Sequence, residues 1–277
     1  MTRRRRPEPP SPILSQVISR DGTSIAVFGE GTGHPILLVH GTAGDHTAFR
    51  VLGPLLARRH AVWTMDRRGR GASGDTLPYS IEREFEDVVA VAGALAAKAG
   101  AAIPVFGHSY GGRCALGAAL LTDAVARIVC YEGAPAPPGR TYHPAGIEAS
   151  LDRHLAAGDG GALLATFMTE IVGMTADELE AYRANPVWPT RVAVASTIPR
   201  ELLAEADAAA SLERLRSVRQ PVLQLLGSAS LPIFREATMA LDARLGDGRV
   251  VEIADAKHAA HHTHPQAVLE AVQAFIG

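Results

Sequence analysis

Short apolar segments alternate with stretches of helical periodicity along most of the chain. The first two, at 13–18 and 24–30, flank Asp21-Gly22, and this turn predicts an antiparallel hairpin. The later segments are apolar at successive positions, which is typical of strands buried on both faces of a parallel sheet. They lie at 34–41, 60–69, 102–109, 127–133, 220–227 and 248–256. The pattern therefore predicts an α/β fold with an eight-stranded, mostly parallel sheet.

Helical patterns fill the intervals between these segments, as expected for right-handed crossovers that cover both faces of a sheet. In the first half of the chain they lie at 47–59, 81–98 and 110–121. Between the sixth and seventh predicted strands the pattern is helical only. We therefore predict a helical cap inserted after the sixth strand.

The predicted domain organisation follows from these patterns. The core of the sheet comprises 13–133 and 221–277, and the cap comprises 134–220. Residues 1–12, MTRRRRPEPPSP, are rich in arginine and proline and lack apolar residues in a periodic pattern. Such a composition predicts a disordered, solvated tail.

Composition restricts the class of protein. The chain has 277 residues, 47% of them hydrophobic, and a formal net charge of −2, so we expect a globular protein without a nucleic-acid partner. No apolar run approaches the roughly 20 residues of a membrane helix, so we expect no membrane partner. Cys114 and Cys130 lie in apolar contexts, which suits a reducing cytoplasm. The oligomeric state stays open.

The stretch 107–111, GHSYG, matches the pattern G-x-S-x-G. It follows the apolar run 103–106 and opens the helical run that begins at Tyr110. A strand, a sharp turn and a helix are the context that a nucleophile elbow requires, so Ser109 is the candidate nucleophile. The alternative is a serine that only caps a helix in a Rossmann-like crossover.

A serine nucleophile needs a general base, and histidine is the usual one. His258 lies four residues past the last apolar run, 250–254, and is the candidate. Its neighbours His261, His262 and His264 resemble a zinc site, but no carboxylate or thiolate lies between them. We therefore expect a general base here and no metal or other cofactor.

Four motifs in order carry a resemblance that spans almost the whole chain. They are LLVHGTAGD, MDRRGRGASG, GHSYGG and the C-terminal KHAAHHTHPQAVLEAVQAFI. Together they resemble the α/β-hydrolase family, in its capped esterase and epoxide-hydrolase-like branch. The resemblance implies Ser109 as nucleophile, His258 as base, and the backbone N–H groups of Thr42 and Tyr110 as oxyanion hole. The N–H of Tyr110 also suits that role because it begins a helix.

The acid of the triad is where this chain departs from the family. In most members an aspartate follows the seventh strand, and here Ser230 stands in its place. Either the triad lacks an acid, or another strand end supplies it. Glu132 follows the sixth strand directly, as does the acid of certain haloalkane dehalogenases and zearalenone lactonases, and parallel strands end at one edge of a sheet. We favour Glu132 as the acid, and a salt bridge at the cap hinge is its alternative role.

The nucleophile indicates the reaction. Epoxide hydrolases and haloalkane dehalogenases of this fold attack through aspartate, whereas a serine indicates transfer of an acyl group to water. We expect hydrolysis of an ester or lactone through an acyl-enzyme. Phe167, Met168 and Trp188 of the cap predict a fairly apolar small-molecule substrate. A lyase of the C–C or hydroxynitrile type, and a ligand-binding protein without turnover, are the alternatives.

Overall fold

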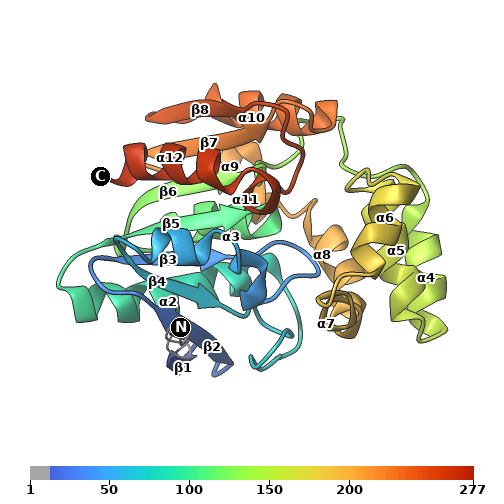
Figure 1. Cartoon of the computed structure of the whole chain (residues 1–277), viewed down its shortest axis with the longest axis horizontal. Helices are drawn as coiled ribbons and strands as arrows, with labels where there is room; N and C mark the ends of the chain where they lie inside the picture. Colours follow the sequence, from blue (N-terminus) through green and yellow to red (C-terminus); the bar gives the residue numbers. More distant parts are fainter. Residues whose placement is uncertain (1–12) are drawn as a thin grey trace, which may run out of the picture.

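The computed structural model describes residues 13–277, so the predicted tail at 1–12 lies outside the described residues (Figure 1). Its eight strands form one sheet in the order β1-β2-β4-β3-β5-β6-β7-β8. The strands are β1 (Ile13–Ile18), β2 (Ser24–Glu30), β3 (Pro35–Val39), β4 (Ala61–Met65), β5 (Ile103–His108), β6 (Val125–Tyr131), β7 (Val222–Gly227) and β8 (Gly248–Ile253). Only the β1–β2 and β2–β4 pairs are antiparallel. The predicted fold class is confirmed.

Successive apolar residues bury both faces of the sheet. In β3, Leu37 and Val39 belong to one hydrophobic cluster, whereas Ile36 and Leu38 belong to another. Because neighbouring side chains on a strand point to opposite faces, the two clusters lie on opposite sides of the sheet. The first is covered by α2 (Ile81–Ala99), α3 (Tyr110–Ala119) and α10 (Pro232–Asp242). The second is covered by η1 (His46–Phe49), α1 (Gly53–Leu56) and α12 (Pro265–Ile276) (Figure 1).

The prediction of one continuous helix at 47–59 is wrong. The structure has a 3-10 helix at His46–Phe49 and a separate four-residue helix at Gly53–Leu56. Proline has no N–H to donate, and its ring clashes with the carbonyl four residues earlier, so a helix cannot run through Pro54. At the first turn of a new helix a proline is tolerated, and Pro54 occupies that place in α1.

The predicted burial of the last strand on both faces is also wrong. In β8 only Ile253 is buried, and Val251 is 38% exposed. The strand is the last in the sheet, so it has one strand neighbour and an open edge. Glu252 of this strand pairs with Arg235 of α10 at 2.6 Å, and charged side chains are common where an edge must not pair with another chain.

The helices between β6 and β7 are α4 (Ile147–Ala156), α5 (Gly160–Glu170), α6 (Ala176–Arg183), α7 (Trp188–Ala193), η2 (Ala195–Thr197), α8 (Ile198–Ala204), η3 (Ala208–Ala210) and α9 (Leu212–Leu215). Those from α4 to α8 form a layer beyond the carboxyl ends of the parallel strands (Figure 1). Leu151, Phe167 and Ile198 belong to a hydrophobic cluster that these helices share. Leu212 and Leu215 instead belong to the core of the sheet, so α9 packs with that core. The division at 134 and 220 stays a prediction.

Within residues 13–277, no helix combines the length and the apolar character needed to cross a bilayer.

Candidate active site

Ser109 occupies a strained turn between β5 and α3. Its backbone angles are φ 53° and ψ −125°, and a positive φ is unusual for a residue with a side chain. Glycines make this turn possible: a Cβ on Gly107 would lie 2.3 Å from the carbonyl oxygen of Gly111. A Cβ on Gly111 would lie 2.3 Å from the carbonyl oxygen of Val39. The sequence motif therefore folds into the predicted elbow.

His258 and Glu132 contact each other at the carboxyl ends of the parallel strands. His258 follows β8, Glu132 follows β6, and Nδ1 of His258 lies 2.6 Å from Oε2 of Glu132. A carboxylate oxygen only accepts, so Nδ1 carries the proton and donates it. The other ring nitrogen, Nε2, is thereby left as the basic atom. Both side chains are buried, with His258 9% and Glu132 3% exposed.

The loop after β7 holds the Glu132 carboxylate from its other side. Oε1 accepts hydrogen bonds from the backbone N–H of Gly227, at 2.7 Å, and from the hydroxyl of Ser230, at 2.6 Å. Ser230 stands where most relatives are expected to have the acid, and here its hydroxyl donates to the carboxylate that follows the neighbouring strand β6. The positive φ of Glu132, 47°, is a second strained backbone position beside Ser109.

Ser109 and His258 line the same two cavities. Among residues 13–277 no hydrogen bond joins the Ser109 hydroxyl to the His258 ring. Such contacts are often long in enzymes without substrate and shorten in the Michaelis complex. The structure thus brings nucleophile, base and acid candidates together, with the base–acid contact already formed.

Two residues with unused backbone N–H groups line the same cavity. Thr42 and Tyr110 both line the cavity that contains Ser109. No hydrogen bond within the described part of the chain uses the N–H of either residue. Tyr110 begins α3, where first-turn N–H groups have no acceptor within the helix. This arrangement suits the stabilisation of an oxyanion.

Two cavities meet at Ser109. The larger has a volume of about 290 Å³, and most of its lining is apolar. Phe167 and Met168 of α5 contribute to it, as the sequence predicted, and Arg50 and Arg191 add positive charge. The smaller, of about 30 Å³, has a lining that is about half polar and half apolar.

The prediction that Trp188 contacts substrate does not fit the structure. Trp188 lines neither cavity, and its ring packs edge-on against Tyr182 at 5.4 Å between centroids. Pro186 and Pro189 flank it and fix the start of α7, which turns the indole toward α6 rather than toward Ser109. Tyr182 lines the larger cavity instead.

His108, His258, His261 and His262 form a stack of tilted rings, with interplanar angles of 43–50° between successive members. Ring centroids lie 4.7 Å apart for His258 and His108, 4.3 Å for His108 and His261, and 4.2 Å for His261 and His262. Nε2 of His108 donates to the carbonyl oxygen of His258 at 2.7 Å. No three His, Cys, Asp or Glu side chains within residues 13–277 are placed to hold a metal ion. The stack fixes the loop that carries His258, a role that the sequence did not reveal.

Acid should destabilise the fold through this stack. Burial holds the pKa of His108 and of His261 well below the usual range, and it lowers the pKa of His262 to about 4. The unfolded chain binds these protons near pH 6.5, so stability present above that pH is lost as the pH falls toward 4. Replacing His261 with glutamine is expected to reduce the loss between pH 7.5 and 5.5 by about 1.4 kcal/mol.

Urea unfolding at the two pH values measures this difference. His154→Gln, on α4 and partly exposed, is the matched control and should leave the wild-type loss unchanged. An equal loss in wild type and His261→Gln would show that His261 does not titrate on unfolding.

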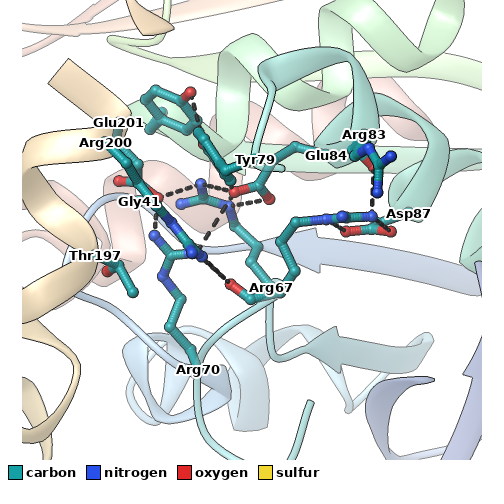
Figure 2. A network of polar contacts seen from close by, with 12 residues as sticks. Gly41, Arg67, Arg70, Tyr79, Arg83, Glu84, Asp87, Thr197, Arg200 and Glu201 are labelled. Carbon is teal, nitrogen blue, oxygen red and sulfur yellow. Dashed lines mark hydrogen bonds and ion pairs between the residues drawn. The ribbon is translucent and has the colours of Figure 1, made fainter. Parts of the chain in front are cut away.

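A buried ion cluster lies beside Gly41, the residue before Thr42 (Figure 2). Arg67 donates to Glu84 at 2.7 and 3.0 Å and to Glu201 of α8 at 2.5 Å, and Arg70 also contacts both carboxylates. All four side chains are buried. Breaking such a pair by removing one partner is strongly destabilising, so α8 is firmly joined to the core at this point.

Arg67 links this cluster to the catalytic loops. Its backbone N–H donates to Nε2 of His40 at 3.1 Å, so the proton of that ring lies on Nδ1, which donates to the carbonyl of Gly41 at 2.8 Å. The guanidinium of Arg67 lies 4.6 Å from the centre of the Tyr110 ring. These contacts hold both segments that carry the free N–H groups. Because Glu201 and Arg67 are far apart in sequence, no local pattern reveals the contact.

Comparison with known proteins agrees with this architecture. A sequence model of the family described as "Alpha/beta hydrolase family" matches residues 36–271. The solved structure of an alpha/beta hydrolase from Sphaerobacter thermophilus is 32% identical, with a TM-score of 0.80 over 95% of this chain and 100% of that one. A hydrolase from Pseudomonas aeruginosa is 25% identical, with a TM-score of 0.75 over 95% of this chain and 98% of that one.

A curated relative matches only part of the chain. The probable oxidoreductase EphD of Mycobacterium tuberculosis is 34% identical over 109 residues, which is 37% of this chain. The matched region spans 18% of the length of that protein. The family match, in contrast, includes the elbow at Ser109, the strand end at Glu132 and the loop at His258. On this evidence, the chain belongs to the alpha/beta hydrolase family.

Proposed function

We propose that this chain is a serine hydrolase that cleaves an ester or lactone of a fairly apolar small molecule through an acyl-enzyme. The observation that carries the proposal is the 2.6 Å hydrogen bond from His258 to Glu132 in a cavity that also contains Ser109. A base oriented by a buried acid, beside a serine on a strained turn, is the arrangement that activates a hydroxyl.

In the first half of the reaction, the Ser109 hydroxyl attacks the substrate carbonyl and transfers its proton to Nε2 of His258. Glu132 stabilises the imidazolium that forms, because its carboxylate accepts the Nδ1 proton. The carbonyl oxygen becomes negatively charged and accepts hydrogen bonds from the N–H groups of Thr42 and Tyr110. When the tetrahedral intermediate collapses, His258 protonates the leaving alcohol and an acyl-Ser109 ester remains.

In the second half, water replaces the alcohol. His258 removes a proton from this water, which attacks the acyl carbonyl through a second oxyanion at the same two donors. Collapse returns the proton to Ser109 and releases the carboxylic acid. A serine nucleophile fits this chemistry better than displacement at an epoxide or haloalkane carbon, for which relatives of this fold use aspartate.

The larger cavity supports an apolar substrate. Its volume of about 290 Å³ is close to the lower end of drug-sized ligand sites, and Phe167, Met168 and Met174 contribute to its wall. Methionine side chains adapt to ligands of different shape. A lyase that uses a cap lysine is disfavoured, because 134–220 contains no lysine.

Covalent labelling tests the proposal. A fluorophosphonate probe is expected to label wild type and not Ser109→Ala, and wild type is expected to hydrolyse p-nitrophenyl esters of short and medium acyl chains. Labelling without ester hydrolysis would favour a lyase that uses the same Ser109 and His258. Failure of both would favour a ligand-binding protein and end the hydrolase proposal.

A further inference from the structure

Arg113 is a buried cation beside the nucleophile. It lies on α3 four residues after Ser109, and four residues of helix rise by about 6 Å. The residue is 3% exposed. A guanidinium has five N–H donors on three nitrogen atoms, and in Arg113 one of these nitrogens forms a hydrogen bond. Nη2 donates to the carbonyl oxygen of Ala134 at 3.1 Å. Within the described residues, Nε and Nη1 have no hydrogen-bond partner.

Arg113 lines the smaller cavity together with Ser109 and His258, and it also lines a third cavity, of about 610 Å³, that contains neither of them. The volume of about 30 Å³ admits a few atoms only, since a single water needs roughly 10–15 Å³ measured in this way. The larger cavity shares Thr42, Ser109 and His258 with it. A substrate with its apolar part in the larger cavity would therefore place only a small group beside Arg113.

The nearest opposite charge does not satisfy the guanidinium. Glu205 is 3.7 Å from Nη1, which is too long for a hydrogen bond. Burial raises the pKa of Glu205, which favours its neutral form. The other carboxylate of the cavity, Glu132, already accepts bonds from His258, Gly227 and Ser230. The rings of Tyr110 and Tyr142 complete the surroundings, at 5.8 and 5.7 Å from the guanidinium carbon.

Buried donors without partners are rare in folded proteins, and each of them needs an explanation such as a bound water, ion or ligand. We propose that Arg113 binds a carboxylate of the substrate in the smaller cavity, so that the preferred substrates are esters or lactones carrying a carboxylate a few bonds from the reacting carbonyl. The guanidinium fork matches a carboxylate with two parallel hydrogen bonds. This inference rests on the proposed function, since it concerns the substrate of the same site.

Matched esters test the proposal. The p-nitrophenyl monoester of glutaric acid and p-nitrophenyl valerate have acyl chains of equal length and differ in the terminal carboxylate. The ratio of their kcat/KM values cancels differences in folded fraction. Wild type is expected to favour the glutarate ester at least about tenfold, and Arg113→Met to reduce this ratio at least about tenfold. Arg153→Met, on the exposed surface of α4, should retain the wild-type ratio.

Two further variants address the Glu205 carboxyl group that Arg113→Met leaves without its neighbour. The double variant Arg113→Met/Glu205→Gln removes both ionisable groups and should lose the preference as the single variant does. Glu205→Gln alone should strengthen binding of free glutarate, because it removes the carboxyl group closest to Arg113. An unchanged ester ratio in both Arg113 variants would overturn the proposal.

Binding of free glutarate separates this proposal from the proposed function. Glutarate, but not valerate, is expected to raise the Tm of wild type and not that of the Arg113 variants. If wild type hydrolyses valerate but shows neither an ester preference nor a glutarate shift, the carboxylate site is wrong and the hydrolase stands. If neither ester is hydrolysed, the proposed function fails, and the glutarate shift alone decides whether Arg113 binds a carboxylate.

Discussion

Replacing Ser109 with alanine is expected to lower kcat for p-nitrophenyl ester hydrolysis by about 10⁴-fold or more. The substitution removes the atom that forms the acyl-enzyme, while alanine keeps the Cβ and the backbone of the turn. Steady-state kinetics measure the effect, and intact-protein mass spectrometry should show no acyl adduct. Thermal unfolding should change little, since the free Ser109 side chain faces the cavity.

Ser196→Ala provides the matched control, because this serine lies exposed in the cap and away from both cavities. It should retain wild-type kcat. Activity of Ser109→Ala within tenfold of wild type would contradict the role of this residue as nucleophile.

Glu132→Gln is expected to lower kcat by about 10⁴-fold while the fold is retained. The amide oxygen of the glutamine can keep the hydrogen bonds from Gly227 and Ser230, which leaves the NH₂ group facing His258. Because an NH₂ group only donates, Nδ1 of the His258 ring must accept a hydrogen bond, and the ring proton lies on Nε2 instead. A protonated Nε2 cannot remove the proton of the Ser109 hydroxyl. The kcat measured by steady-state kinetics and the rate of fluorophosphonate labelling should both decrease.

A second substitution tests whether the position of the acid matters. Ser230 already contacts the Glu132 carboxylate, so Ser230→Asp in the Glu132→Gln background restores a carboxylate at the place usual for the family. Partial recovery of kcat is the expected result. In the wild-type background the same Ser230→Asp should lower stability, because it places two carboxylates in contact. If Glu132→Gln equals wild type in kcat, the acid lies elsewhere, and the proposed roles of Ser109 and His258 survive.

Features that depend on neighbouring residues were predicted from the sequence. The Asp-Gly turn marked β1 and β2, and apolar runs marked the six later strands, of which β3, β5 and β7 are buried at nearly every position. The elbow at Ser109 was predicted because close backbone contacts require its glycines, Gly107 against Gly111 and Gly111 against Val39 of β3. The choice of Glu132 followed from one rule of topology, that parallel strands end at the same edge.

Features that depend on contacts between distant segments were missed. Trp188 was expected to line the cavity because it is a large apolar residue of the cap. In the structure its ring packs against Tyr182 instead. The stack of His108 on His261 gave no pattern in the sequence, since the two residues lie on different elements. The same holds for Glu201, whose partner Arg67 lies at the end of β4.

The sequence by itself determined the α/β sheet, the positions of its crossovers and the identity of the candidate nucleophile, base and acid. The sheet and the candidate nucleophile follow from local periodicity and a short motif with a backbone requirement, and the candidate base and acid follow from their positions just after predicted strands. Only the tertiary structure decided that Ser230 donates to Glu132 and that Arg113 lies buried with unused donors beside Ser109. Burial and hydrogen bonding depend on tertiary contacts. These contacts join segments that are far apart in the sequence, and they form only when the chain folds.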